Sequence, residues 1–199
     1  MTIRLLSVNV ATVGSLLVND AEEGFRRIPS AYDKRAVAGA VQITRTGLTG
    51  DEQANRDVHG GIDKAVYAYP VEHYPYWQEQ RRTYLQRDDV MPHGAFAENL
   101  TIAGLLEDQV WIGDRLQIGE ALLEVTEPRE PCFKFTIRMG FGKAAKLMLH
   151  SGYTGFYLKV LREGRVVAND AITLIPGPRQ ETVATFNARR RMGRQPDLF

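Results

Sequence analysis

The stretch GDRLQIGEALLEVTEPREPCFK, residues 113 to 134, decides the fold class of this chain. Its apolar and polar side chains alternate, which is the period of a strand with one packed face. Turn-forming pairs at Gly113-Asp114 and Gly119-Glu120 interrupt the alternation. The stretch therefore predicts short strands of a β-meander joined by tight turns.

The same pattern continues outward in both directions from this stretch. RLLSVNV at residues 4 to 10 and AVYAYP at residues 65 to 70 are typical of strands, and residues 98 to 106 extend the meander. Residues 155 to 175 predict a hairpin that turns at Glu163-Gly164. Residues 16 to 35 are irregular or hairpin-like in pattern.

Helices are few in this pattern. Residues 71 to 87 predict an amphipathic helix with Pro75 near its first turn, and residues 142 to 152 a short helix that ends at Gly152. Many short strands with few helices predict a mainly β fold, either a barrel or a distorted sandwich, without alternating βαβ units.

The chain divides into one main domain and a short tail. We expect the domain to cover residues 1 to 175, because 199 residues suit one sizeable core. From Pro176 the composition becomes basic, with five arginines against one glutamate and one aspartate. Residues 176 to 199 therefore predict a helical tail that is mobile or packs on a partner subunit.

Composition excludes several classes of function. The formal charge is +1, so no global field recruits nucleic acid or an anionic membrane. One cysteine cannot close an internal disulfide, and no apolar run approaches the roughly 20 residues that cross a bilayer. We expect a cytoplasmic protein with neither nucleic acid nor membrane as a partner. No P-loop, G-x-S-x-G, G-x-G-x-x-G or zinc-type histidine spacing is present.

Cys132 lies in a stiff segment, because Pro128 and Pro131 favour extended backbone before them. Arg129 and Lys134 are close in sequence, and positive charge near a thiol favours the thiolate that attacks electrophiles or binds metals. A small buried apolar residue is the other interpretation of a lone intracellular cysteine.

Two further motifs allow a functional and a structural interpretation. His59-Gly60-Gly61 could offer backbone amides to an anion, or it could form a tight structural turn. Asn99 could bind the polar edge of a pterin or purine, or it could satisfy a turn.

Taken together, residues 47 to 77, 94 to 102, 113 to 134 and 154 to 172 resemble the MOSC domain family, in particular its YiiM-like branch. The resemblance covers about residues 1 to 175, and the joint order of the motifs is more specific than any one of them. It implies a distorted β-barrel that binds the molybdenum cofactor, a molybdopterin with a phosphate and a dithiolene. Cys132 would ligate the metal, because a soft thiolate suits molybdenum.

The branch also implies an activity. This is the two-electron reduction of N-hydroxylated compounds such as hydroxylamino purines, with a flavoprotein or an iron–sulfur protein as electron donor. A homo-oligomer is possible. The resemblance and position together suggest these residues around the cofactor: Lys34, Arg35, Arg45, His59, Gly60, Glu98, Asn99 and Arg129.

Two alternatives stay open. Cys132 could carry a persulfide or the cofactor to another protein without turnover, or the domain could be structural with an inert cysteine. Two departures from the branch bear on activity. Residues 11 to 31 are longer and more polar than the family pattern, and only 24 residues follow Ile175, where longer relatives have three helices.

Overall fold

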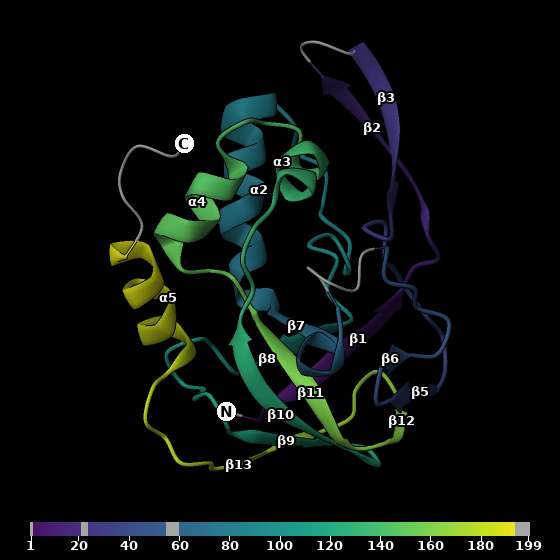
Figure 1. Ribbon diagram of the computed structural model, residues 1–199, viewed down its shortest axis with the longest axis vertical. Helices are drawn as coiled ribbons and strands as arrows, with labels where there is room; N and C mark the ends of the chain where they lie inside the picture. The colour runs from purple at the N-terminus through teal and green to yellow at the C-terminus, as the bar shows by residue number, and fades with distance from the viewer. Residues whose placement is uncertain (1, 21–23, 55–59, 194–199) are drawn as a thin grey trace.

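A curved sheet of eight strands forms the body of the protein in this computed structural model, which describes residues 2–20, 24–54 and 60–193 (Figure 1). Neighbouring strands are antiparallel except for the parallel pair β7 and β8. The strands in order across the sheet are β13 (Ile172–Ile175), β9 (Arg115–Ile118), β10 (Ala121–Pro128), β11 (Phe156–Arg162), β7 (Val66–Pro70), β8 (Leu100–Ala103), β1 (Arg4–Val10) and β4 (Arg35–Ala36).

The parallel pair corrects two sequence-based expectations. The chain leaves β7 through η2 (Val71–His73) and α2 (Tyr74–Leu85) and returns as β8 beside β7, so one βαβ unit is present. β8 therefore lies apart from β9 and β10, and only the latter two form the predicted hairpin of the meander. The prediction of the helix is confirmed, with Pro75 in its first turn.

β12 (Gly164–Val166) does not form the predicted hairpin with β11. Both edges of β11 are already occupied, by β10 and β7. β12 instead pairs with β5 (Val41–Thr44), which also pairs with β6 (Gly47–Leu48), to give a separate three-stranded sheet.

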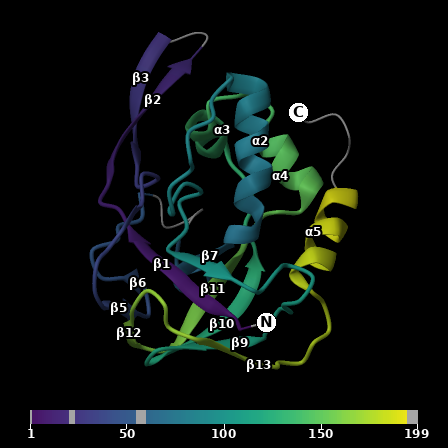
Figure 2. The ribbon, with the colours of Figure 1, turned by 180° about the vertical axis from the view of Figure 1, so that it is seen from behind.

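A second small sheet is the hairpin of β2 (Gly14–Asp20) and β3 (Gly24–Ser30). It projects from the body beside the helices, as both views show (Figure 1, Figure 2). The hairpin interpretation of residues 16 to 35 is confirmed for this part of them. The side chains of Leu17 and Phe25 are 49% and 72% exposed, so the hairpin buries little apolar surface of its own.

The mainly β class is confirmed. The described residues contain four α-helices, and no closed barrel is found among them. The sheet nevertheless curls strongly. The amide of Leu5 in β1 donates to the carbonyl of Asp170, and the amide of Ile172 donates to the carbonyl of Ile3, at 3.0 and 2.9 Å. These bonds bring the start of β13 to β1, without a continuous ladder that closes the sheet.

Two helices, α3 (Phe133–Met139) and α4 (Ala144–Ser151), lie between β10 and β11 in sequence, and α5 (Val183–Met192) follows β13. The sequence predicted α4, and Gly152 ends it with a φ of 74°. It also predicted a helix in the tail. α5 packs against its own chain and buries Val183 completely, which differs from the expectation of a mobile tail, and packing on a partner subunit stays a prediction. α3 was not predicted.

Two clusters of buried side chains make up the core. The first consists mainly of aliphatic residues from the strands, such as Leu5, Ile43 and Leu116. The second is rich in aromatic residues, including Trp77 and Phe96, and lies where α2, α3 and α4 cover β7 and β11. No helix in the described part of the chain is long and apolar enough to cross a membrane.

Candidate functional site

Cys132 lies at the wall of a pocket, where the end of β10 passes into α3. Its backbone is extended, with φ −119° and ψ 173°, and its carbonyl accepts the amide of Phe135 at 2.9 Å, which starts the helix. The residue is half-buried, so its side chain is neither at the surface nor deep in the core. The two prolines before it thus precede a short helix, and the thiol is held at the helix start.

Positively charged side chains surround the same pocket. They come from four separate segments: the loop after β3, η1 (Ile62–Lys64), the end of β10 and the first turn of α3. The lining also includes the carboxylates of Asp51 and Glu52, so four cations face two acidic side chains, and the net positive charge beside the thiol suits an anionic ligand. The four cations are Lys34, Lys64, Arg129 and Lys134.

Arg129 is the most buried of these cations, at 5% exposure. Its guanidinium donates to the carbonyl of Phe96 and to the hydroxyl of Tyr32, and it lies 4.9 Å from the centre of the Tyr67 ring. No carboxylate among the described residues forms an ion pair with it. A buried charge is costly unless it is paired, so a cation that lines a pocket without an acidic partner is prepared to receive an anion.

Three tyrosines line the pocket around this guanidinium: Tyr32 and Tyr67 face it, and Tyr157 packs against the Tyr67 ring at 5.3 Å. Burial raises the pKa of Tyr32 to about 12, and Arg129 only partly offsets this rise. Burial also raises the pKa of Tyr67 and of Tyr157. At neutral pH the three rings are therefore neutral walls around a fixed positive charge.

Lys34 and Asn99 both line the pocket, but their polar groups already have protein partners. Lys34 forms a buried ion pair with Asp51, with side-chain exposures of 8% and 4%. Burial lowers the pKa of Lys34, and Asp51 opposes that change. The amide of Asn99 donates to Asp51 at 2.8 Å and accepts the backbone amide of Tyr67 at 3.1 Å. Asn99 therefore links β1, β7 and the loop at Asp51, and Lys34 pairs with the same loop, so both side chains have structural contacts.

Glu98 is not among the residues that line the pocket. It is fully buried, and its carboxylate accepts the amides of Gly94 and Phe96 at 2.7 and 3.0 Å. It also accepts the hydroxyls of Tyr74 and Thr101. Through these hydrogen bonds Glu98 fixes the loop that contains Ala97, which has a φ of 61° and lies in the pocket wall.

The other predicted residues lie elsewhere or outside the described chain. Arg35 is exposed and pairs with Asp33 at 3.2 Å, and Arg45 is exposed beside Glu163. Gly60 does not line the pocket. His59 lies outside the described residues. The structure thus brings Cys132 together with Arg129, Lys34 and Asn99 from the predicted set.

The three tyrosines around Arg129, which we call the tyrosine cage, were missed by the sequence analysis. Tyr32, Tyr67 and Tyr157 come from three distant segments, and each fits a strand or loop pattern by itself. A weak signal exists, because Tyr67 lies in a strand that is buried on both faces, where a phenol needs a polar partner. Its hydroxyl finds one in the carbonyl of Thr154, at 2.7 Å.

A family model supports what this geometry suggests. The model of the MOSC domain matches residues 55–173, more than half of the chain. This chain belongs to the MOSC domain family. MOSC domains are associated with molybdenum-cofactor binding in general, so the family is consistent with a pocket that combines a thiol with cations.

Relatives in the family include bacterial and fungal proteins. The chain is 44% identical to the uncharacterized protein YflK of Bacillus subtilis and 40% identical to protein YiiM of Escherichia coli, over 71% and 74% of its length. These matches span 61% and 64% of the two relatives. A protein of Gibberella moniliformis named reductase is 37% identical over 76% of this chain and 26% of its own.

Solved MOSC structures agree with the fold. The crystal structure of YiiM from Geobacillus stearothermophilus has a TM-score of 0.74 and 31% identity, with 94% of this chain and 83% of that chain covered. YiiM from Escherichia coli has a TM-score of 0.69 and 28% identity, with 94% and 74% covered. The chain is therefore a MOSC protein of the YiiM type.

Proposed function

We propose that this MOSC protein binds the molybdenum cofactor in the pocket at Cys132 and reduces N-hydroxylated compounds such as hydroxylamino purines. The observation that carries the proposal is that one pocket is lined by a half-buried thiol and by the buried guanidinium of Arg129, which has no carboxylate partner among the described residues. Family membership and the fungal relative named reductase support the same class of function.

The residues present fit the chemistry of that cofactor. A thiolate is a soft ligand that suits molybdenum, and the dithiolene would supply the other sulfur atoms. Arg129 offers a fork of donors in a low-dielectric wall, which suits a phosphate or another anionic part of the cofactor. Lys64 and Lys134 are less buried and would add positive charge at the mouth.

When bound, the cofactor would supply the two-electron chemistry that removes oxygen from the substrate nitrogen. The balanced reaction takes an N-hydroxyl compound, two electrons and two protons to the amine and one water. This chain has a single cysteine, too few for an iron–sulfur cluster of its own. The electrons would therefore come from a separate flavoprotein or iron–sulfur protein. The protein's own part is to hold and orient the cofactor in a wall of neutral tyrosines and fixed cations.

The test uses full-length protein made in a host that synthesises the cofactor. Molybdenum and the fluorescent pterin oxidation product are measured in the wild type, in Cys132→Ala and in Arg165→Met. Arg165 is 66% exposed, pairs with Glu120 and lies outside the pocket, so its variant is the control. We expect about one molybdenum per chain in the wild type and the control, with a loss of at least about tenfold in Cys132→Ala.

Activity is measured with a hydroxylamino purine and a chemically reduced flavin as donor. Equal molybdenum in wild type and Cys132→Ala would overturn the ligand role. A labile sulfur adduct on Cys132 by mass spectrometry, with no reduction of any N-hydroxylated compound, would instead establish a sulfur or cofactor carrier.

A further inference from the structure

The C-terminal helix α5 contacts the segment that carries Cys132 through one side chain. Arg190 places Nη2 3.2 Å from Oε2 of Glu127 and Nη1 3.5 Å from Oε2 of Glu130. Glu127 lies near the end of β10, and Glu130 lies two residues before Cys132. One guanidinium thus spans two carboxylates of the segment that ends at the thiol.

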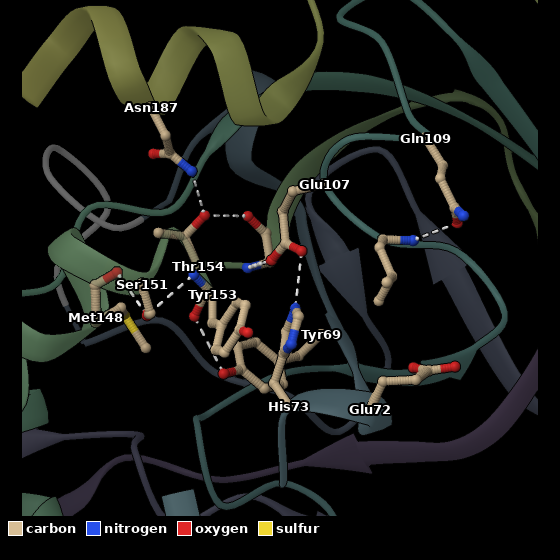
Figure 3. A network of polar contacts seen from close by, with 12 residues as sticks. Tyr69, Glu72, His73, Glu107, Gln109, Met148, Ser151, Tyr153, Thr154 and Asn187 are labelled. Atoms are coloured by element: carbon tan, nitrogen blue, oxygen red, sulfur yellow. Dashed lines mark hydrogen bonds and ion pairs between the residues drawn. The ribbon is translucent and has the colours of Figure 1, made fainter. Parts of the chain in front are cut away.

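The position of α5 is fixed from the body of the protein. The amides of Val183 and Ala184 donate to the carbonyls of Val110 and Glu107, at 3.0 and 2.9 Å. Asn187 donates to the hydroxyl of Thr154 at 2.7 Å, as Figure 3 shows. Because these contacts join the helix to loops and to the start of β11, α5 is a firm base for Arg190.

The guanidinium is also oriented within the helix. Its central carbon lies 5.2 Å from the centre of the Phe186 ring, a distance that suits a cation–π contact. The neighbouring Arg189 lies 4.9 Å from the same ring but pairs with Glu181, away from the thiol segment. The helix therefore contains two arginines of similar setting, of which only Arg190 contacts the acidic residues of the site.

Glu127 also connects Arg190 to a cation that lines the pocket. The other oxygen of that carboxylate, Oε1, lies 3.3 Å from Nζ of Lys64, which lines the pocket and lies 5.6 Å from the Tyr157 ring centre. Glu127 is shared between two cations, and Glu130 faces one of them. Without Arg190, two negative charges within five residues of Cys132 would lose their common partner and oppose anions at the pocket.

We propose that Arg190 is a positioning residue of the Cys132 site. It neutralises Glu127 and Glu130 and so keeps the approach to the thiol favourable for anionic ligands. The inference rests on the proposed function in that it concerns the same site, where the ligand would be an anionic cofactor. It predicts that the tail helix completes the electrostatics of the pocket, because Arg190 contacts both carboxylates, whereas Lys64 forms an ion pair with Glu127.

The test uses the full chain purified without cofactor, so its result does not depend on molybdenum. Rates of reaction of Cys132 are measured with an anionic aromatic disulfide, 5,5′-dithiobis(2-nitrobenzoate), and with neutral iodoacetamide. The variants are Arg190→Ala, Arg190→Lys and Arg189→Ala. We expect the ratio of anionic to neutral rates to fall roughly two- to fivefold in Arg190→Ala, because exposed pairs have modest coupling.

Arg190→Lys should recover most of this ratio, and Arg189→Ala should keep the wild-type ratio. The difference should shrink in about 1 M salt, where the Debye length is near 3 Å. An unchanged ratio in Arg190→Ala would overturn the proposal. So would an equal fall in Arg189→Ala, or an equal change with both reagents, which would mark a structural effect of the helix alone. If the cofactor test fails while this ratio changes, only the proposed function is lost.

Discussion

The hydroxyl oxygen of Tyr32 lies 3.1 Å from Nη2 of Arg129, and the Tyr32 ring centre lies 5.4 Å from the guanidinium carbon. The phenol therefore accepts a hydrogen bond from the cation and also faces its charge. This contact joins the loop after β3 to the end of β10, two segments almost 100 residues apart. It fixes the cation beside the thiol segment, and the rings of Tyr67 and Phe135 lie 4.9 and 5.5 Å from the same guanidinium carbon.

Replacement of Arg129 should separate its hydrogen bonds within the protein from its proposed contact with an anionic ligand. Arg129→Met removes the charge and leaves the buried carbonyl of Phe96 without its donor, at a cost of about 1–3 kcal/mol in the free energy of unfolding. Arg129→Lys keeps a charge but loses the fork and the planar contact with the rings. We expect both variants to retain less molybdenum, and the methionine variant the least.

Metal analysis and urea unfolding measure these effects, with the exposed Arg165→Met as a control. Wild-type molybdenum in a folded Arg129→Met protein would contradict the assignment of Arg129 to the anion.

Tyr32 makes the protein sensitive to alkaline pH. Its pKa is about 12 in the folded protein because burial disfavours the phenolate, against an ordinary value of 10.0. Between these values the unfolded chain loses a proton that the folded protein keeps, so stability falls as pH rises. This pKa difference of two units corresponds to a loss of roughly 3 kcal/mol at most in the free energy of unfolding. Stability from this group is complete below about pH 10 and declines toward pH 12.

In Tyr32→Phe, the free energy of unfolding should therefore fall less as the pH rises. Urea unfolding at several pH values between 8 and 11 tests this, and phenolate absorbance counts the ionising tyrosines. The variant loses the acceptor of Arg129, so a lower but flatter stability curve is expected. A curve parallel to that of the wild type would show that Tyr32 ionises normally in the folded protein.

The sequence predicts strands and helices well where one segment carries the whole signal. Alternation located β9 and β10, and Pro75 and Gly152 located a helix start and a helix end. The sequence fails to predict strand pairing where the pairing depends on which strand edges are already occupied. β12 pairs with β5 because β11 is enclosed by β10 and β7, a fact that no local pattern contains.

α3 was missed although the sequence holds a usable signal. Phe135 and Met139 are four residues apart and both buried, and Gly140 ends the helix at φ 83°. The two prolines before Cys132 instead suggested extended chain throughout. Of the residues that line the pocket, Cys132 and Arg129 were predicted from one segment, whereas Lys64 and the tyrosine cage required the fold to bring distant segments together.

Glu98→Gln tests whether this residue acts in the structure or at the pocket. The carboxylate accepts four donors, from Gly94, Phe96, Tyr74 and Thr101, and an amide would turn its NH₂ group toward some of them. We expect a loss of roughly 2–4 kcal/mol in the free energy of unfolding. The rate of Cys132 labelling by iodoacetamide, measured far below the unfolding midpoint, should change little. A stable Glu98→Gln protein that no longer retains molybdenum would assign the carboxylate to the cofactor.

Lys34→Met tests whether this lysine serves Asp51 or an anionic ligand. Both side chains of the pair are nearly inaccessible, so removal of the lysine leaves a buried carboxylate without its cation. Such a loss costs about 3–5 kcal/mol. Asp51→Asn in the same chain should recover part of this cost, because it removes the unpaired charge and its amide oxygen can still accept the amide of Ala11, while its NH₂ group loses the bond from Asn99. Urea unfolding of the two single variants and the double variant gives the coupling energy. If Lys34→Met keeps wild-type stability but loses bound molybdenum, the lysine pairs mainly with the ligand, and the buried ion pair contributes little.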